Sequence, residues 1–239
     1  MNRPATSTTD HHGPTSAEET GVAAPAPISH TASTMTTQLP VSPQHLDAIR
    51  EIVNIGAGHA ATNLSQLTGL TVMISVPRIQ WVARAALIAS LPGDGELVLI
   101  SVPIVGVSED GGEQAALILA KETALRMVAL MMRRDPSRHT EIGALEESAL
   151  KEMGNIVCAA YVGVLGTFLN KGVMIGTPVL AAGDREVVGR DVVDGLLIET
   201  DFTFLETTFE GVFVLSHAEV SFASLLRALG FKDVAERAS

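Results

Sequence analysis

Two pairs of polar residues in this sequence have the same spacing and recur at one fixed interval. Glu51 and Asn54 form the first pair, and Glu152 and Asn155, each 101 residues further along, form the second. A carboxylate accepts hydrogen bonds, whereas a neutral carboxamide both donates and accepts them and can orient a water molecule. One such pair is weak evidence, because Glu and Asn on a helix are usually only solvated. Their recurrence makes both pairs candidates for a functional role.

The recurrence extends beyond the pairs. Pro77 returns as Pro178, and Val72-Met73-Ile74 returns as Val173-Met174-Ile175, both at the same interval. Coincidence would not keep one register over more than thirty residues. The pattern therefore indicates an internal duplication of about 100 residues.

A long amphipathic helix is predicted to carry each pair. The first begins at Pro43, with Ser42 as its N-cap. At ~100° per residue, Asp47, Glu51 and Asn54 share one side of this helix. Its opposite, buried side is predicted to consist of Ile49, Ile52, Val53, Gly56, Ala60, Leu64 and Leu67.

The second helix has the same division. Ser148, which occupies the position of Asp47, shares a side with Glu152 and Asn155. Gly58 of the first helix lies almost in line with its pair, where it leaves room for a partner or serves close packing. The opposite side of the second helix consists of Leu150, Met153, Val157 and Tyr161.

The remaining elements repeat in the same order, so that each half reads as helix, strand, variable segment, strand, strand, helix. The segment 79–92 is ambiguous. We predict an α+β fold in which two halves related by pseudo-twofold symmetry form one six-stranded sheet covered by helices. The predicted strands are 71–77, 96–105, 113–120, 172–180, 195–203 and 211–217, and the further helices are 121–132 and 219–229.

The chain is predicted to contain one folded domain, residues 41–232, made of repeats at about 43–133 and 144–231. Residues 1–40 are rich in Thr, Ser, Pro, Ala and His and have almost no large apolar side chains. Such a segment cannot bury enough surface to offset its ordering entropy, so we predict a disordered tail. Residues 233–239 are predicted to be a flexible C-terminus.

The composition limits the partners and the compartment. The formal net charge of −11 argues against nucleic acid, whose phosphates would be repelled. Cys158 is the only cysteine, which excludes an internal disulfide and fits a reducing cytoplasm. The most apolar helical run, 156–169, is shorter than the roughly 20 residues of a membrane span, and the N-terminus lacks the features of a signal peptide. We therefore expect a cytoplasmic protein without a membrane segment.

Common nucleotide, zinc and hydrolase motifs are absent from the sequence, including the phosphate-binding loop, the His-Glu-x-x-His helix and the Gly-x-Ser-x-Gly elbow. The pair His11-His12 lacks a third ligand, so no metal site is predicted. Gly56 and Gly58 superficially resemble part of a dinucleotide fingerprint, but they lie inside a helix rather than after a strand. Close packing against another helix or the sheet explains Gly56 better.

Three residues have plainer interpretations. Cys158 is surrounded by small apolar residues and is predicted to be a small buried side chain. Trp81 either marks a binding surface or caps the core. His59 has no evident base or nucleophile beside it in the sequence.

The duplicated pattern resembles that of the CheC/CheX/FliY family, phosphatases that act on the response regulator CheY in bacterial and archaeal chemotaxis. The likeness covers about residues 43–231. Two intact motifs resemble CheC rather than CheX, which keeps one site and dimerises, and the additional C-terminal motor domain of FliY-type members is not expected. The family pattern Asp/Ser-x3-Glu-x2-Asn-x22-Pro is matched by Asp47, Glu51, Asn54 and Pro77 and again by Ser148, Glu152, Asn155 and Pro178.

The resemblance implies roles for these residues. Asn54 and Asn155 would position the water that attacks the aspartyl phosphate of a partner receiver domain, and Glu51 and Glu152 would pair with the invariant lysine of that partner. The bound Mg²⁺ would come from the receiver domain, so the protein would need no cofactor of its own.

The other motif positions are expected to contribute less. Asp47 and Ser148 would be peripheral contacts, and Pro77 and Pro178 would shape the end of a strand. CheC relatives also bind the deamidase CheD, which makes CheD a second expected partner.

Two other functions fit the same residues. A non-catalytic adaptor would dock receiver domains through its acidic faces without hydrolysing their phosphate. A structural αβ domain with merely solvated Glu and Asn is the simplest alternative, and the duplicated motif argues against it.

Overall fold

The two long helices begin and end at equivalent positions of the repeats. In the computed structural model, α1 spans Pro43–Thr68 and α4 spans Ala144–Leu169, and both have 26 residues. The structure describes residues 43–93, 95–107, 112–135, 140–216 and 226. The predicted tail, the cap Ser42, the closing helix at 219–229 and the C-terminus at 233–239 lie outside these ranges, apart from Leu226, which is helical and buried.

The ends of these helices are also equivalent. Each helix is followed by one residue with a left-handed backbone, Gly69 with φ of 65° and Asn170 with φ of 49°. This conformation is common after a helix C-terminus, because it lets nearby N–H groups bond the last helical carbonyls. Here the N–H of Gly69 donates to the carbonyl of Ser65 at 2.9 Å, and the N–H of Lys171 donates to that of Gly166 at 3.0 Å.

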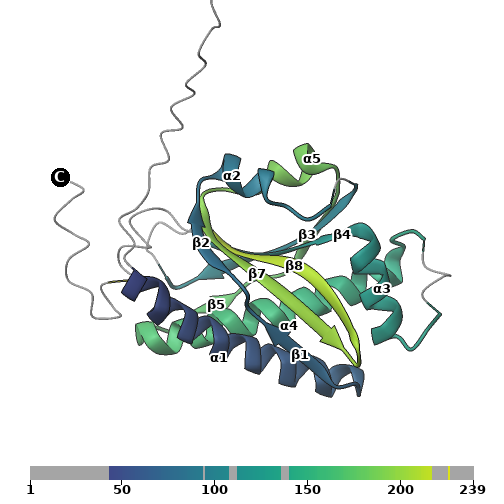
Figure 1. Ribbon diagram of the computed structural model, residues 1–239, viewed down its shortest axis with the longest axis horizontal. Helices are drawn as coiled ribbons and strands as arrows, with labels where there is room; N and C mark the ends of the chain where they lie inside the picture. Colours follow the sequence, from purple (N-terminus) through teal and green to yellow (C-terminus); the bar gives the residue numbers. More distant parts are fainter. Residues whose placement is uncertain (1–42, 94, 108–111, 136–139, 217–225, 227–239) are drawn as a thin grey trace, which may run out of the picture. The chain divides into compact units, whose positions relative to one another are not determined.

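In the part of the chain that the structure describes, eight strands form one antiparallel sheet in the order β1-β7-β8-β4-β3-β5, with β2 also paired to β7 and β6 also paired to β3 (Figure 1). The sheet thus has six positions across, as predicted, but eight strands rather than six. The strands are β1 (Val72–Ser75), β2 (Ile79–Val82), β3 (Leu97–Val105), β4 (Gln114–Ala120), β5 (Met174–Ile175), β6 (Val179–Gly183), β7 (Gly195–Phe204) and β8 (Thr207–Ser216).

The two additional strands arise near the motif prolines. Pro178 lies between β5 and β6, so the predicted strand 172–180 is divided in two. Pro77 lies between β1, which falls within the predicted strand 71–77, and the additional strand β2. Proline has no N–H to donate to a ladder, which favours such a break at a sheet edge. The ambiguous segment 79–92 contains β2 and then a short helix, α2 (Arg84–Ala89).

The two repeats exchange their first strands. Strands β1 and β2 of the first repeat pair with β7 of the second, as in the pairing of Val72 with Phe204. Strands β5 and β6 of the second repeat pair with β3 of the first, as in the pairing of Ile175 with Ile104. At the centre, β4 pairs with its counterpart β8. Neither repeat therefore has a complete sheet without the other.

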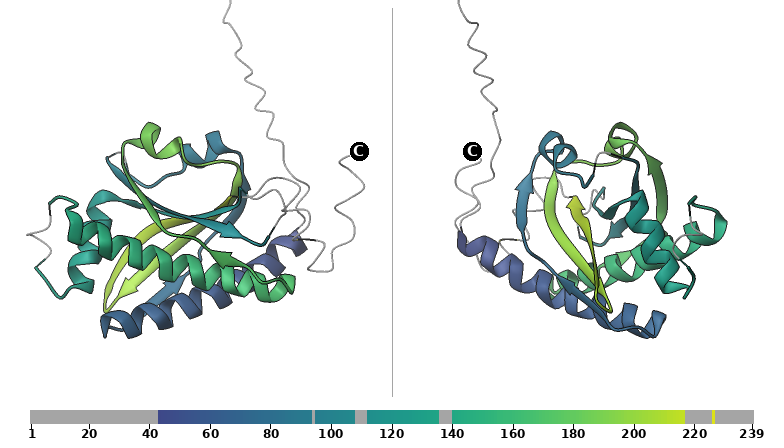
Figure 2. Two further views of the ribbon diagram at one scale, coloured as in Figure 1. Left: turned by 180° about the vertical axis from the view of Figure 1, so that it is seen from behind. Right: turned by 45° about the vertical axis from the view of Figure 1, so that its right-hand side comes forward.

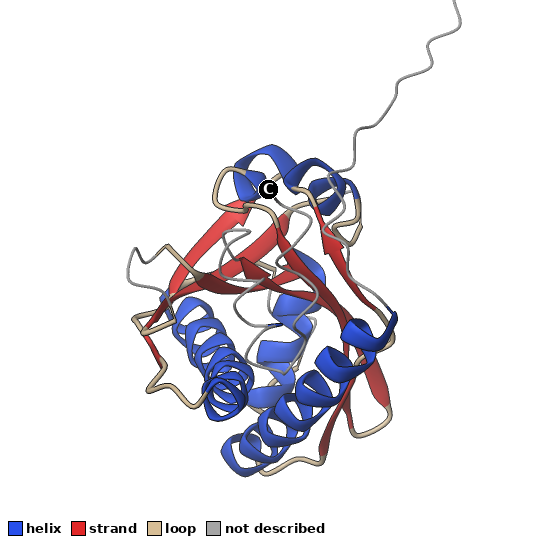
Figure 3. Ribbon diagram, turned by 90° about the vertical axis from the view of Figure 1, so that its left-hand side faces the viewer, coloured by secondary structure: helices blue, strands red, loops and turns tan. Residues whose placement is uncertain are grey.

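Helices cover both faces of this sheet (Figure 3). On one face lie α1, α4 and α3 (Lys121–Met131), and on the other lie α2 and α5 (Arg185–Gly189). Residues along β3 alternate between the two cores: Val98 and Ile100 pack towards the long helices, and Leu97 and Leu99 pack towards the short ones. Such strands are buried on both faces, which explains their nearly continuous apolar sequences.

A reciprocal arginine contact joins the two short helices. The Arg84 guanidinium donates to the carbonyl of Gly189 at 2.7 Å, and that of Arg185 donates to the carbonyl of Ile88 at 2.9 Å. Both arginines and both carbonyls are equivalent pairs in the two repeats. This contact is direct evidence for the pseudo-twofold relation between the halves.

One residue of the predicted buried stripe was placed wrongly. Leu67 is 49% exposed, whereas the neighbouring Thr68 is buried. The buried residues of α1 advance in steps of four, through Gly56, Ala60 and Leu64 to Thr68. Such a stripe follows the i, i+4 ridge and turns gradually around the helix, so it leaves Leu67 on the outside.

The α4 helix is a core element. Among the described residues it is the one helix that is long and apolar enough to cross a membrane by length and composition, and 56% of its most apolar window is buried inside the fold. Cys158 is fully buried, as predicted, and burial raises the pKa of its thiol. Trp81 packs partly buried against the same core, which agrees with the interpretation of a core cap.

Candidate functional site

The long helices lie side by side and run in opposite directions (Figure 2). They approach closely at Gly56, where an added Cβ would lie 2.8 Å from Cδ1 and 3.1 Å from Cα of Tyr161. The expectation that Gly56 serves close packing is therefore confirmed. Because each Glu-x-x-Asn pair is in the first half of its own helix, the antiparallel arrangement places the two pairs towards opposite ends of the helix pair.

The pairs are at the protein surface. Glu51, Asn54 and Glu152 are exposed, and Asn155 is partly buried. Within the described part of the chain, the structure gives these four side chains no hydrogen bond or ion pair. Each helix therefore offers an uncommitted carboxylate and, one turn further on, an uncommitted carboxamide.

The surroundings of the two pairs differ. Asp47 is exposed beside the first pair, whereas at the second pair the hydroxyl of Ser148 donates to the carbonyl of Ala144 at 2.8 Å. Gly58 is exposed, and nothing lies within 4 Å of a Cβ added there. Its counterpart, Ala159, already has that Cβ and is also exposed. The space beside the first pair is thus wider by a methyl group.

The motif prolines are not part of either helix. Pro77 is exposed and Pro178 is partly buried, each in the short connection between two edge strands. These positions place both prolines at the edge of the sheet and outside the two helices that carry the Glu-x-x-Asn pairs.

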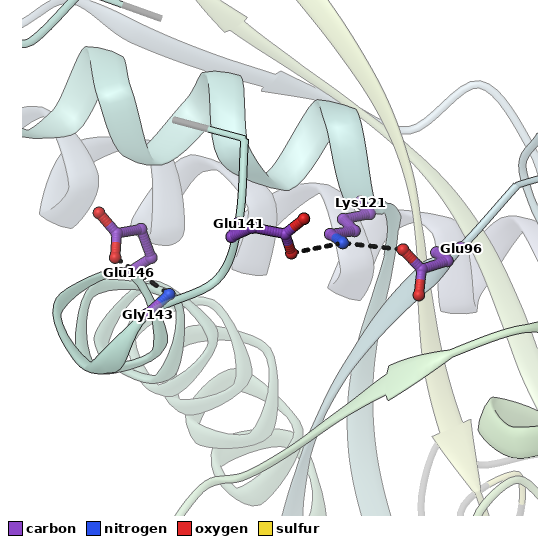
Figure 4. A network of polar contacts seen from close by, with 5 residues as sticks. All are labelled: Glu96, Lys121, Glu141, Gly143 and Glu146. Carbon is purple, nitrogen blue, oxygen red and sulfur yellow. Dashed lines mark hydrogen bonds and ion pairs between the residues drawn. The ribbon is translucent and has the colours of Figure 1, made fainter. Parts of the chain in front are cut away.

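A polar network fixes the beginning of the second helix (Figure 4). The ammonium group of Lys121 binds the carboxylates of Glu96 at 2.8 Å and Glu141 at 3.0 Å. Two residues beyond Glu141, the N–H of Gly143 donates to the Glu146 carboxylate at 3.2 Å, which occupies one donor at the start of α4. The hydrogen bond to Glu96, followed by that to Glu141, raises the pKa of Lys121. The segment just before α4 is therefore tied by an ion pair to the first residue of α3.

Sequence reasoning missed a further repeated position. Arg50 directly precedes Glu51, and Lys151 directly precedes Glu152, so a basic residue stands at the same place in both repeats. The signal was the same 101-residue interval that identified the acidic and amide residues.

The described residues contain no group of three or more His, Cys, Asp and Glu side chains that could hold a metal ion. His59 is exposed on α1. A hollow between α1, α4, β7 and β8 contains no Glu-x-x-Asn residue and is apolar, apart from one tyrosine. Its lining consists of Ile49, Ile52, Val53, Tyr161, Leu165, Leu196 and Leu215.

Comparison with known proteins assigns both halves to one family. Residues 45–80 and 145–181 each match the model of the CheC-like family, and these two ranges contain every motif residue described above. Both repeats of the chain thus match the CheC-like family.

Individual proteins that match this chain share limited sequence identity with it. A Halobacterium salinarum protein named "Putative CheY-P phosphatase CheC1" is 28% identical over 151 residues, which cover 63% of this chain and 75% of the relative. The crystal structure of Thermotoga maritima FliY has 22% identity and a TM-score of 0.65, and the match covers 81% of this chain and all of that one. The middle domain of Helicobacter pylori FliM has 16% identity and a TM-score of 0.57, with 79% and 99% covered. These two structures show that the fold is shared.

Proposed function

We propose that this CheC-like protein is a phosphatase that hydrolyses the aspartyl phosphate of a CheY-like receiver domain in chemotaxis or two-component signalling. One observation carries the proposal: two Glu-x-x-Asn pairs lie at equivalent, solvent-accessible turns of two equivalent helices. The name of the halobacterial relative supports the same activity. The substrate is a cytoplasmic protein, which gives this phosphatase a cytoplasmic location.

In the proposed reaction, the receiver domain supplies the acyl phosphate, its Mg²⁺ and its lysine. This chain adds an amide group. A second carboxylate beside the phosphoryl group would be repelled, whereas the neutral carboxamides of Asn54 and Asn155 accept from and donate to the attacking water. Holding that water in line with the phosphorus lowers the barrier by positioning. Glu51 and Glu152, one turn earlier, pair with the receiver lysine and set the docking register.

The proposed role requires the partner to reach both residues of a pair at once. The uncommitted side chains on α1 and the open space at Gly58 support this approach. Asp47 and Ser148 lie one turn before the glutamates and contact the rim of the partner. A CheD-like protein remains a second partner under this proposal.

The test follows the loss of radiolabelled phosphate from a purified phospho-receiver in the presence of the full chain. The Asn54→Ala/Asn155→Ala double variant is expected to leave only the receiver's own rate of phosphate loss, with the fold preserved because neither side chain is buried in the core. Asn63→Ala is the matched control, since Asn63 is an exposed asparagine of α1 that points about 180° away from Asn54 around the helix.

Three outcomes separate the alternatives. Loss of acceleration in the double variant, with Asn63→Ala active, supports the phosphatase. Binding of the phospho-receiver without any acceleration by the parent protein supports the adaptor. A double variant as fast as the parent protein would show that the amides do not position the water.

A further inference from the structure

Each Glu-x-x-Asn pair has a basic residue as a third member. On a helix, residues four apart are neighbours on the surface. Arg50 is therefore adjacent to Asn54, and Lys151 is adjacent to Asn155. Each amide thus has a carboxylate three residues before it and a cation four residues before it.

The two cations are in different states. Arg50 is exposed and has no ion pair or hydrogen bond within the described ranges. The ammonium group of Lys151 binds the carboxylate of Glu147 at 2.6 Å, and the two side chains are 36% and 45% exposed. Leu46 occupies the position of Glu147 in the first repeat, so α1 has no acid at the place where α4 has one.

A free cation at this position has an evident use if the proposed function holds. The phosphorylation pocket of a receiver domain is anionic, because it combines a phosphoryl group with carboxylates. This chain has a net charge of −11 and therefore repels such a pocket at long range. A local positive charge next to the amide offsets that repulsion at the point of contact. A guanidinium group can also bind phosphate or carboxylate oxygens through two parallel hydrogen bonds.

We infer that Arg50 and Lys151 are the docking cations of the two sites, and that Glu147 weakens the second site by holding Lys151. This inference rests on the proposed phosphatase function and adds a contact to it. The partner face that they bind is the anionic rim of the phosphorylation pocket. Because Arg50 is free and Lys151 is engaged, the first site binds the phospho-receiver more tightly.

The expected effects differ in size. Removing Arg50 loses a charge-assisted contact and should raise KM about tenfold. Glu147 and the partner compete for Lys151. Removing Glu147 releases Lys151 from one exposed i, i+4 ion pair, which should change KM by about twofold. Both effects should shrink as salt is raised, since the contacts are near the surface.

The experiment isolates each site in the full-length chain by removing the other amide. With Asn155→Ala as background, Arg50→Ala should raise KM for the phospho-receiver about tenfold with kcat unchanged, and Arg50→Lys should recover most of the loss. Leu46→Glu should raise KM about twofold, and Leu46→Gln, which adds no charge, should not. With Asn54→Ala as background, Glu147→Gln should lower KM about twofold.

Arg134→Ala is the control for net charge, because it removes one exposed positive charge just after α3. If Arg50→Ala behaves like Arg134→Ala, with the same KM and the same salt dependence, Arg50 is not a docking cation. If Glu147→Gln leaves KM unchanged, Glu147 does not restrain the second site. In both cases the phosphatase proposal survives, because its own test is the double asparagine variant.

Discussion

Where α1 and α4 meet, the first helix contributes Gly56 and Ala60, and the second contributes Val157 and Tyr161 at the equivalent positions. Gly56 faces the large Tyr161, whereas the symmetric contact would pair Ala60 with Val157. On one side of the pseudo-twofold axis the contact thus combines the large side chain of Tyr161 with a glycine. On the other side the two equivalent residues, Ala60 and Val157, are both of smaller, more similar size. In a close-packed interior, one half of such a contact cannot change in volume without the other.

The surface around the Glu-x-x-Asn pairs is under no such restriction. Asp47, Leu46 and Gly58 of the first helix correspond to Ser148, Glu147 and Ala159 of the second, so the two surfaces differ in charge and in side-chain size. The comparison teaches that differences between the repeats at the helix contact are complementary in volume, whereas the residues that flank the identical Glu-x-x-Asn pairs differ in charge and size. Unequal sites are therefore the expectation for this protein.

The variant of the shared core with the largest expected effect is Tyr161→Ala. The ring is 3% exposed and stacks on Phe213 with centroids 4.4 Å apart. Its removal should lower the free energy of unfolding by about 3–5 kcal/mol, the cost of a large cavity. Urea unfolding of the full chain measures this value.

Tyr161→Phe is the matched control. The buried hydroxyl of Tyr161 makes no hydrogen bond of normal geometry among the described residues, but while burial raises the pKa of this hydroxyl, Thr200 is close enough to lower it against that rise. Removal of the hydroxyl should therefore change the free energy of unfolding by no more than about 1 kcal/mol. A loss of several kcal/mol in Tyr161→Phe would mean that the hydroxyl, and not the ring, holds the helices together.

A smaller effect is expected from the two glycines on α1. Gly56→Ala puts a methyl group against the backbone of Tyr161 and should destabilise the fold by about 1–3 kcal/mol. Gly58→Ala meets nothing within 4 Å and should stabilise the helix by up to about 1 kcal/mol. Equal unfolding midpoints for the two variants would contradict the close approach of α1 and α4.

The smallest effect concerns the balance between the two sites. If both contributed equally, Asn54→Ala and Asn155→Ala would each leave half of the phosphatase activity. Because Asn54 is exposed and Asn155 is partly buried, we expect Asn54→Ala to lose more than half and Asn155→Ala to lose less, a difference of about 0.4 kcal/mol or twofold. Initial rates at low phospho-receiver concentration measure it, and identical residual rates would show that the sites are equivalent.

Much of the fold could be predicted from the sequence because its signals are local or repeated. The 101-residue interval predicts that α4 begins where α1 does, and β3, β4 and β7 begin within one residue of their predicted starts. The division of the edge strands could not be predicted in this way. Each pair of short strands is defined by one long partner strand in the other repeat, β7 or β3, and such pairing leaves no local pattern.

At the candidate site, sequence reasoning found the acidic and amide residues and missed the basic ones. Arg50, Lys151, Arg84 and Arg185 all follow the 101-residue interval, but a search for carboxylates and amides passes over them. The exposure of Leu67 was missed for another reason. It depends on the crossing of two helices, which a helical wheel drawn for one helix does not contain.

The exchange of first strands between the repeats has a consequence for folding during synthesis. Val72 cannot form its strand pairing until Phe204 has been synthesised, and Phe204 is among the last residues of the described sheet to be made. While the chain leaves the ribosome, α1 and its apolar stripe have no finished sheet to cover, and pairing across so long a stretch of chain makes folding slow. The topology therefore predicts that the N-terminal half exposes apolar surface until the second repeat has been synthesised.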